Sequence, residues 1–267
     1  MHDKLRALYP RHFWTPITEG ESGAGIYRLM PRGGDRHVLY MKTAPSKAVN
    51  PALNLDAEAD RLEWLGAKGI PVARLVDRGY NDTTTWMVTE AVAGIPAAAN
   101  WPDHRREAVV DALADLARTL HAQPADDCPF DRRLAVSIAE AEEAVSNALV
   151  NLDNLEDEYA GWSAEQLLCE LHRTRPAVEE AVLCHGDFCP DNVLLDPETC
   201  QVTGLIDVGR LGLADRHVDL AIALRELSTD DAPWFQAHFA RRFVHRYGQG
   251  DIDQERVAFY TLLDEFF

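Results

Sequence analysis

Positive charge is scarce in this 267-residue chain, which has 26 Lys and Arg residues against 44 Asp and Glu and a formal net charge of −18 at pH 7. An acidic surface repels nucleic-acid phosphates and anionic lipid headgroups, so we expect neither nucleic acid nor a membrane as a partner. A small polycation would be attracted instead. Taken alone, however, the acidic excess is explained more simply as a means of keeping the protein soluble.

Cysteine pairs of the kind that build disulfide frameworks or zinc sites are missing, because the 5 cysteines are odd in number and form no CxxC motif. That usage favours a reducing compartment. The first residues, Met1–Lys4, begin no apolar run of signal-peptide length. No apolar run approaches the roughly 18 residues that a membrane span requires. We therefore expect a cytoplasmic protein, of an oligomeric state that the sequence leaves open.

The hydrophobic pattern before residue 92 is mostly that of strands. One stretch, 55–67, has helical spacing instead. Strand-like runs are expected at 26–29, 38–43 and 86–90.

After residue 92 the pattern becomes helical. Apolar residues recur at helical steps over 108–120, and similar stretches follow at 136–149 and 163–172. A small β insert is expected between 181 and 206. We predict an α+β fold with a small β-rich N-terminal lobe, 1–92, a larger, mostly helical C-terminal lobe, 93–267, and a cleft between them.

The segment His185–Asn192 has the strongest chemical signal. Asp187 and Asn192 lie five residues apart in it, between two apolar segments, and Asp207 ends the next apolar run. In protein kinases the first Asp accepts the proton of the attacking hydroxyl, while the Asn and the later Asp bind metal. Phosphoryl transfer concentrates negative charge, so oxygen ligands must hold Mg²⁺ while a separate base faces the acceptor. A turn rich in Asp and Asn is the alternative for Asp187 and Asn192 alone, and Asp207 argues against it.

Lys42 ends the expected strand 38–43, where alternation places it on one face with Val38 and Tyr40. A Lys in this position can neutralise nucleotide phosphates, and Tyr40 beside it can stack on a purine ring. A solvated lysine at a strand end is the alternative.

Glu58 strengthens the case for Lys42. It lies on the apolar stripe of 55–67, three residues after Leu55 and four before Leu62. A carboxylate on a buried face needs a partner, and Lys42 on the preceding strand is the natural candidate, as in the Lys–Glu pair of protein kinases. The alternative is a Glu at the edge of the stripe that reaches water.

The glycine-rich turn Gly20–Gly25 lies one strand before Lys42. Its backbone amides and the Ser22 hydroxyl can cap nucleotide phosphates. A hairpin turn explains it as well, and its spacing matches neither a Walker A loop nor the GxGxxG loop of protein kinases.

Acidic residues gather at 153–158 and again in the last residues, Leu263–Phe267. Runs of charge are most often solvated faces. A cationic ligand would nevertheless need such carboxylates.

With these residues in place, the chain resembles the aminoglycoside phosphotransferases, and specifically their 3' subgroup, over nearly its whole length. The motif HGDxxxxN with a later Ile-Asp is shared by many small-molecule kinases, whereas the ending Leu-Asp-Glu-Phe-Phe is typical of the 3' enzymes. Besides His185–Asn192, the similar stretches are Gly20–Gly23, Glu58–Leu65, Cys128–Leu134, Gly204–Gly212 and Leu263–Phe267.

The resemblance implies a protein-kinase-like two-lobed fold. It also implies transfer of the γ-phosphate of ATP, with Mg²⁺, to the 3'-hydroxyl of kanamycin- or neomycin-type drugs, which gives antibiotic resistance. Asp187 would be the catalytic base, and Asn192 and Asp207 the Mg²⁺ ligands.

The same resemblance assigns the binding residues. At the nucleotide phosphates, Ser22 would contact the β-phosphate, and Lys42, held by Glu58, would bind the α- and β-phosphates. At the base, Tyr40 would stack on adenine. The backbone of Thr89 and Ala91 would hydrogen-bond to the adenine. Drug ammonium groups would meet the carboxylates of Asp153, Glu156, Asp264, Glu265 and the C-terminal Phe267. Arg210 and Arg225 would contact the substrate or stabilise the site.

Three alternatives remain open. A streptomycin kinase shares the catalytic loop and Cys128–Leu134, but the C-terminal residues speak against it. A catalytically dead nucleotide-binding protein would not need the intact set of Asp187, Asn192, Asp207 and Lys42. A metal-dependent hydrolase, with no need of Lys42 or Glu58, would use His185, Asp187, Asp207, His217 and Asp219 as ligands.

Overall fold

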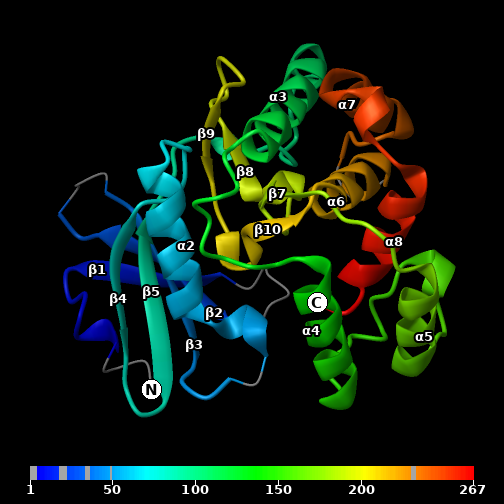
Figure 1. The fold of residues 1–267 in the computed structure, drawn as a ribbon. Helices are drawn as coiled ribbons and strands as arrows, with labels where there is room; N and C mark the ends of the chain where they lie inside the picture. The colour runs from blue at the N-terminus through cyan, green and yellow to red at the C-terminus, as the bar shows by residue number, and fades with distance from the viewer. Residues whose placement is uncertain (1–4, 18–22, 34–36, 49, 230–232) are drawn as a thin grey trace. The chain divides into compact units, whose positions relative to one another are not determined.

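The computed structural model describes residues 5–17, 23–33, 37–48, 50–229 and 233–267 (Figure 1). The chain divides into two compact units. Unit 1 comprises Met1–Ala93 and Gly204–Gly209, and unit 2 comprises Gly94–Thr203 and Arg210–Phe267. Within the described ranges, no helix combines the length and the apolar character needed to cross a membrane.

Unit 1 is built on a five-stranded antiparallel sheet with the strand order β1-β2-β3-β5-β4. Helix α2 packs against β3, β4 and β5, and Figure 1 shows it lying across the sheet. The bounds are β1 (His12–Ile17), β2 (Gly25–Pro31), β3 (Leu39–Pro45), α2 (Leu55–Ala67), β4 (Leu75–Tyr80) and β5 (Thr84–Glu90).

Alternation along β3 separates the core of unit 1 from its functional face. Leu39 and Met41 are buried with Leu29 and Val88 in one apolar cluster. Because successive side chains of a strand point to opposite faces, Tyr40 and Lys42 lie on the other face.

Helix α2 begins where the sequence supplies a cap. The Asn54 side chain accepts a hydrogen bond from the Ala57 amide at 3.1 Å, which satisfies one of the free N–H groups of the first turn. The helix buries one stripe, Leu55, Glu58, Ala59, Leu62 and Leu65. The predicted helix 55–67 and the place of Glu58 on its buried stripe are therefore confirmed.

Unit 2 is mostly helical. Its helices are α3 (Asp103–His121), α4 (Leu134–Ser146), α5 (Ala164–Thr174), α6 (His217–Ser228), α7 (Ala237–Tyr247) and α8 (Gln254–Asp264). Its short strands are β6 (Ile95–Pro96), β7 (Ala181–Cys184), β8 (Val193–Leu195) and β10 (Gly212–Asp215). Strand β7 pairs with β10, while β8 lies between β6 and β9 (Val202–Leu205), whose last residues belong to unit 1.

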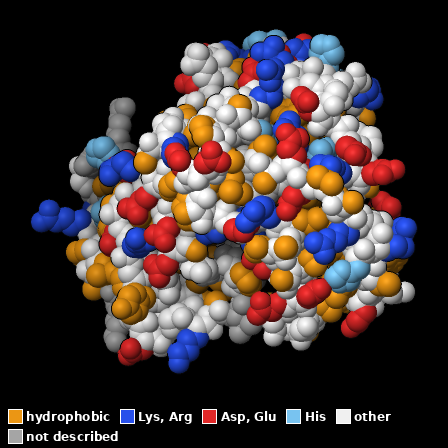
Figure 2. Space-filling view, in the orientation of Figure 1, with side chains coloured by type: hydrophobic (Ala, Val, Ile, Leu, Met, Phe, Trp, Pro, Cys, Tyr) orange, Lys and Arg blue, Asp and Glu red, His pale blue; other side chains and the backbone are white. Residues whose placement is uncertain are grey.

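Helices α4, α5, α6 and α8 share one apolar core, which includes Leu167, Phe259 and Phe266. Helices α3 and α7 are joined by ion pairs of Arg242 with Asp111 at 2.7 Å and of Arg246 with Asp115 at 2.6 Å. Figure 2 shows basic and histidine side chains gathered over α3 and α7, whereas acidic and basic side chains are mixed elsewhere on the face in view.

The predicted succession of a strand-rich part and a helical part with a β insert is confirmed. Strands β1, β4, β6 and β10 were not predicted from the sequence; β6 is only 2 residues long. The first two are the edges of the sheet and largely exposed, so they lack a strong apolar pattern, and β10 is only 4 residues long.

Candidate active site

The candidate residues fall into two groups, one in each unit. In unit 1, the Lys42 ammonium lies 2.8 Å from Glu58 Oε1 and 2.6 Å from Asp207 Oδ1. The side chains of Lys42 and Glu58 are only 17% and 6% exposed. Burial alone would lower the pKa of Lys42, but the charges of Glu58 and Asp207 together raise it above its ordinary value. Lys42 is therefore held as a cation, as the sequence predicted for its pairing with Glu58.

Asp207 reaches this cluster although it lies far along the chain from Lys42. The Leu205 amide donates to the Pro71 carbonyl and the Ala73 amide to the Leu205 carbonyl, both at 3.0 Å, which ties Gly204–Gly209 to unit 1. Asp207 itself has a φ of 57°. A left-handed conformation at a residue other than glycine is unfavourable and concentrates at functional sites, where surrounding contacts enforce it.

In unit 2, the loop after β7 holds Asp187 and Asn192 together. The Asn192 side-chain amide donates to the Asp187 carbonyl and to Asp187 Oδ2, both at 2.9 Å. Asn192 is buried, so its amide fixes the orientation of the partly exposed Asp187 carboxylate. Asn192 Oδ1 accepts no hydrogen bond from the part of the chain that the structure describes. The predicted pair is thus brought into direct contact.

Gly186 can only be glycine in this loop. Its φ is 84°, and a Cβ atom there would lie 2.3 Å from the Arg210 carbonyl oxygen. The close approach brings the backbone of Arg210 against the residue that precedes Asp187.

The backbone of the same loop is fixed from below by Asp219, a residue of α6 that is fully buried. Its Oδ2 accepts from the His185 amide and its Oδ1 from the Gly186 amide, both at 2.8 Å. His121 Nε2 lies 3.1 Å from Asp219 Oδ2, and His121 Nδ1 lies 2.8 Å from the Tyr247 hydroxyl. Asp219 therefore serves the geometry of the loop.

Within the described ranges, His121, Cys184 and Asp219 also form a group with the composition of a metal site. Its atoms are engaged otherwise, because His121 hydrogen-bonds to Asp219 and to Tyr247, and Asp219 also accepts from the loop. Burial raises the pKa of the Cys184 thiol well above its ordinary value, so the thiolate that metals bind is disfavoured. We read this group as structural.

The ligand set of a metal-dependent hydrolase is not available in unit 2. His217 Nδ1 lies 2.6 Å from Asp215 Oδ1, and its Nε2 accepts from the Asp253 amide at 2.9 Å. Since both His217 ring nitrogens and both Asp219 oxygens are occupied, neither side chain presents an atom to a metal.

The residues assigned to the base of the nucleotide lie on neighbouring strands. Tyr40 in β3 is paired with Thr89 in β5. The Ala91 amide donates to the Val38 carbonyl at 2.9 Å, which leaves the Ala91 carbonyl as the group that can accept from a ligand. Ser22 lies outside the described residues.

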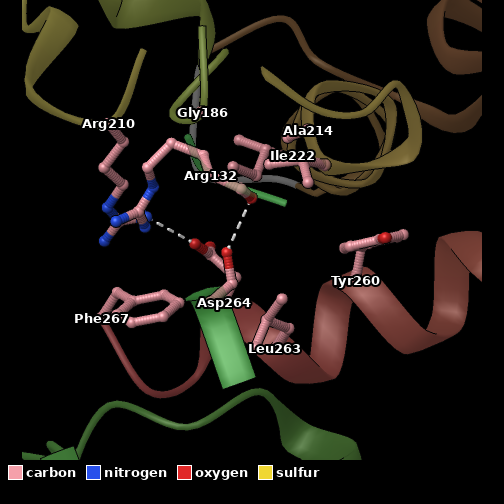
Figure 3. A pocket seen from close by; sticks show the side chains of 11 residues that line it. Arg132, Gly186, Arg210, Ala214, Ile222, Tyr260, Leu263, Asp264 and Phe267 are labelled. Atoms are coloured by element: carbon pink, nitrogen blue, oxygen red, sulfur yellow. Dashed lines mark hydrogen bonds and ion pairs between the residues drawn. The ribbon is translucent and has the colours of Figure 1, made fainter. Parts of the chain in front are cut away.

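The C-terminal acidic residues differ sharply in their surroundings. Asp264 Oδ1 lies 2.8 Å from Arg210 Nη1, and Asp264 Oδ2 lies 2.8 Å from Arg225 Nη1. Figure 3 shows the Arg210 guanidinium facing Asp264, with the Phe267 ring on the same side of the pocket. Burial disfavours the charge of Arg210, but Asp264 and Asp187 raise its pKa above the ordinary value. Arg210 is therefore a permanent cation beside the catalytic loop.

Glu265 lies next to Asp264 but forms no ion pair with a described residue, although the charge of Arg225 acts on it. It accepts a hydrogen bond from the Glu156 amide at 3.4 Å. Burial raises the pKa of Glu265 to about 7, and the neighbouring Glu156 adds to the shift. Arg225 pairs with the Glu156 carboxylate at 3.2 Å. Asp153 is exposed and forms no ion pair with any described residue.

Phe267 is 41% exposed, whereas Phe266 is buried in the core. The Phe267 ring centre lies 5.1 Å from the guanidinium carbon of Arg210 and 5.8 Å from that of Arg132. Between these side chains and α8 is a cavity of about 30 Å³, which is room for one water molecule. Arg132, which pairs with Glu140, lies within the Cys128–Leu134 stretch, but the sequence pattern assigned it no role at the site.

Comparison with known proteins gives consistent results. A family model described as the phosphotransferase enzyme family matches residues 14–260. An aminoglycoside 3'-phosphotransferase of Streptomyces fradiae is 57% identical over 263 residues, 98% of each chain. The crystal structure of a type VIII aminoglycoside-3'-phosphotransferase superposes with a TM-score of 0.91 at 52% identity, covering 100% of this chain and 99% of that one.

A third relative is an aminoglycoside phosphotransferase of Streptomyces rimosus, solved in complex with ADP and streptomycin. It superposes with a TM-score of 0.81 at 34% identity and covers 98% of this chain and 95% of that one. These superpositions confirm the predicted kinase-like α+β fold.

Proposed function

Because this chain belongs to the aminoglycoside 3'-phosphotransferase family, we propose that it transfers the γ-phosphoryl group of ATP to the 3'-hydroxyl of kanamycin- or neomycin-type aminoglycosides and so confers resistance. The observations that carry the proposal are the Lys42 cluster with Glu58 and Asp207 in unit 1 and the Asp187–Asn192 pair in unit 2, which together supply the residues of a kinase site. A hydrolase needs neither the buried lysine nor its glutamate. A kinase needs both the lysine cluster, which binds the nucleotide phosphates, and the Asp187–Asn192 pair, which supplies the base and a metal ligand.

In the nucleotide half of this reaction, Lys42 binds the α- and β-phosphates. Glu58 holds the ammonium in place from α2, because a buried carboxylate at 2.8 Å fixes its position. Tyr40 stacks on adenine, and Thr89 and Ala91 contact its edge through their backbones. Ser22 caps the β-phosphate. A complex of a relative with ADP supports the choice of an adenine nucleotide.

The donor atoms of Asn192 and Asp207 fit Mg²⁺, which prefers hard oxygen ligands. The Asn192 amide nitrogen is turned to Asp187, which leaves its oxygen available. Asp207 is 40% exposed, and its Oδ2 accepts no hydrogen bond from the described residues. When bound, the ion would offset charge on the phosphates.

Asp187 acts as the general base. The 3'-hydroxyl oxygen attacks the γ-phosphorus, its proton passes to the Asp187 carboxylate, and the bond from the γ-phosphorus to the β–γ bridging oxygen breaks to leave ADP. The hydrogen bond from the Asn192 amide to Asp187 Oδ2 keeps the carboxylate oriented for this step, and a second one holds the Asp187 main-chain carbonyl. General-base catalysis of this kind contributes about 10²–10⁴-fold.

The drug is a polycation, and this protein offers it carboxylates. We assign its ammonium contacts to Asp153, Glu156, Glu265 and the C-terminal carboxylate of Phe267, with Arg210 and Arg225 stabilising the site; Asp264 belongs to the same group by resemblance. We also propose that the nucleotide-binding lobe is 1–92, that the catalytic and drug-binding lobe is 93–267, and that the enzyme works in the cytoplasm, where ATP is present.

An ATP-coupled assay across kanamycin, neomycin, streptomycin and the 3'-deoxy drug tobramycin tests the proposal. We expect turnover of kanamycin and neomycin, with ³¹P–¹H NMR placing the phosphate at the 3' oxygen. Tobramycin keeps its ammonium groups but lacks the acceptor, so it should inhibit competitively against kanamycin. Turnover of streptomycin with none of kanamycin would instead support the alternative, a streptomycin 3''-kinase.

A further inference from the structure

A buried polar chain runs from the end of α7 to the catalytic loop. The Tyr247 hydroxyl lies 2.8 Å from His121 Nδ1, and His121 Nε2 lies 3.1 Å from Asp219 Oδ2. Asp219 in turn accepts from the amides of His185 and Gly186, both at 2.8 Å. Tyr247, His121 and Asp219 are 4%, 8% and 0% exposed, so bulk water does not compete for the contacts between them.

Resting on the proposed function, we infer that Tyr247 is a positioning residue of the reaction, whose hydroxyl acts through His121 and Asp219 on the catalytic loop. Tyr247 lies outside every motif that the sequence marks, on a helix from which the proposed site takes no residue. Its hydroxyl sets which ring nitrogen of His121 carries the proton. His121 in turn fixes the direction in which the Asp219 carboxylate holds the loop.

Helix packing brings the Tyr247 ring to His121. Tyr247 is the last residue of α7 and His121 the last residue of α3. These two helices lie side by side (Figure 1) and are tied together by the ion pairs of Arg242 and Arg246. The Tyr247 ring also stacks on Phe243 of its own helix, with ring centres 6.1 Å apart and an angle of 5° between the planes. Packing therefore places the ring, and the hydroxyl makes the polar contact.

The direction of these hydrogen bonds follows from what each group can donate. An ionised Asp219 only accepts, and its other partners are backbone amides, so His121 Nε2 carries the proton that it donates. In the neutral ring Nδ1 is then an acceptor, and the Tyr247 hydroxyl donates to it. Burial raises the pKa of Tyr247 to about 12, although the charge of Arg216 opposes the shift, so the hydroxyl keeps its proton at neutral pH.

Arg216 supports the same assignment from the far side of Tyr247. Its guanidinium hydrogen-bonds to the Tyr247 hydroxyl and pairs with Glu180 at 2.7 Å. If both ring nitrogens of His121 donated, the hydroxyl would receive two hydrogen bonds, and its own hydrogen would lack an acceptor among the described residues. The arrangement therefore favours the neutral His121 ring with its proton on Nε2, the form that can anchor Asp219.

Loss of the Tyr247 hydroxyl removes the reason for this tautomer. With Nδ1 unpartnered, the ring proton can also lie on Nδ1, and His121 then presents a bare Nε2 to the Asp219 carboxylate. Two acceptors 3.1 Å apart repel each other, so Asp219 turns and the amides that it holds shift with it. The reaction tolerates little displacement of its base, because a misplacement of about 1 Å can cost about 10²-fold in rate.

Tyr247→Phe removes only the hydroxyl, and Tyr260→Phe is the matched control. Tyr260 is 3% exposed in unit 2, and its hydroxyl has no hydrogen-bond partner among the described residues. With rates corrected for the folded fraction, Tyr247→Phe should lower kcat about three- to tenfold and change the KM for ATP and for kanamycin less than about twofold, a part of the cost of a full misplacement. Tyr260→Phe should leave kcat unchanged. Equal kcat in both variants, or a KM effect as large as the kcat effect, would overturn the inference.

Two substitutions of His121 separate its two contacts. A Gln amide can still donate to Asp219, whereas a Leu side chain cannot. We expect His121→Gln to keep a kcat at least about fivefold above that of His121→Leu, because the donor that orients the carboxylate is retained. In the Leu background, Tyr247→Phe should cost less than about twofold further. Equal losses for Gln and Leu, or an undiminished effect of Tyr247→Phe in the Leu background, would show that the hydroxyl does not act through His121.

A third measurement needs neither drug nor ATP. Imidazole ¹⁵N NMR of the wild type, with His121 assigned by its absence in His121→Gln, should show a protonated Nε2 and a bare Nδ1. Hydrogen exchange of the His185 and Gly186 amides should be faster in Tyr247→Phe than in Tyr260→Phe. A proton on Nδ1 in the wild type, or equal exchange in the two variants, would overturn the inference. If the wild type binds kanamycin without phosphorylating it, the proposed function fails, whereas the tautomer and the amide exchange still decide whether Tyr247 fixes the loop.

Discussion

Replacement of Glu58 by Gln tests the buried ion pair on which the nucleotide site depends. The substitution keeps the shape of the side chain and removes its charge. Glu58 is 4% exposed overall, and Lys42 would be left with Asp207 as its remaining partner at 2.6 Å. The change therefore leaves the buried Lys42 ammonium with one neutralising carboxylate in place of two.

The expected cost follows from that geometry. Removing one partner of a buried pair typically destabilises by about 3–5 kcal/mol, because the other charge stays buried. Asp207 still contacts Lys42, and the new amide oxygen can accept one hydrogen bond. We therefore expect a loss of about 2–3 kcal/mol in the free energy of unfolding, at or just below the lower limit of that range. The KM for ATP should rise about tenfold or more, since Lys42 loses its fixed position.

Urea unfolding followed by circular dichroism measures the first effect, and a coupled assay with varied ATP measures the second. Glu63→Gln is the matched control, because Glu63 lies on the same helix, is 58% exposed and pairs with Arg78 at 3.7 Å. An exposed pair of this kind contributes about 0–1 kcal/mol. Equal, small losses in both variants, with an unchanged KM for ATP, would refute the reasoning.

Four further outcomes follow from the geometry. Asp187→Ala should keep the fold by circular dichroism and lose about 10²–10⁴-fold in kcat; retention of a tenth of the wild-type rate would reassign the base. Gly186→Ala should lower both stability and kcat, because a Cβ atom would lie 2.3 Å from the Arg210 carbonyl oxygen; thermal melting together with turnover checks it. Deleting Phe267 alone should raise the KM for kanamycin far more than that for ATP, since Phe266 stays in the core, and equal rises would make the C-terminus a packing element. Burial raises the pKa of Glu265 from 4.5 to about 7, so the kanamycin affinity of the wild type relative to that of Glu265→Gln should increase from pH 6 to pH 8. In drug-free protein, the stability that protonated Glu265 contributes is complete below about pH 4.5 and is lost as pH rises through 7. A ratio of the two kanamycin affinities that does not change with pH would contradict the raised pKa.

The nucleotide cluster was largely predictable from sequence because its signals are local. Strand alternation placed Lys42 with Tyr40, and helical spacing placed Glu58 on a buried stripe, so a buried charge had to find a partner on the neighbouring strand. The structure shows that partner at 2.8 Å. Asp207 could be assigned by motif only, because its contact with Lys42 depends on Gly204–Gly209 returning to unit 1.

The resemblance named Arg210 and Arg225, but their pairing with Asp264 could not be predicted from the sequence pattern. Arg210 and Arg225 lie 54 and 39 residues before Asp264, and no short-range period links such positions. Their convergence depends on how α6 and α8 pack in the core of unit 2. The same reasoning explains why Phe266 and Phe267, identical neighbours in sequence, could not be separated into a core residue and a partly exposed one.

The net charge of −18 includes every carboxylate equally, but in the structure some carboxylates are paired with arginine and others are not. Asp111 and Asp115 are already paired with arginines of α7, at 2.7 and 2.6 Å, so their charges are largely compensated within the protein. Under the proposed function, attraction of a polycation would come mainly from carboxylates such as Asp153 and Glu265, which form no ion pair with a described residue. Because such attraction between exposed charges is screened over about 8–10 Å at 0.1–0.15 M salt, added salt should weaken drug binding through a few specific residues and not through the acidic surface as a whole.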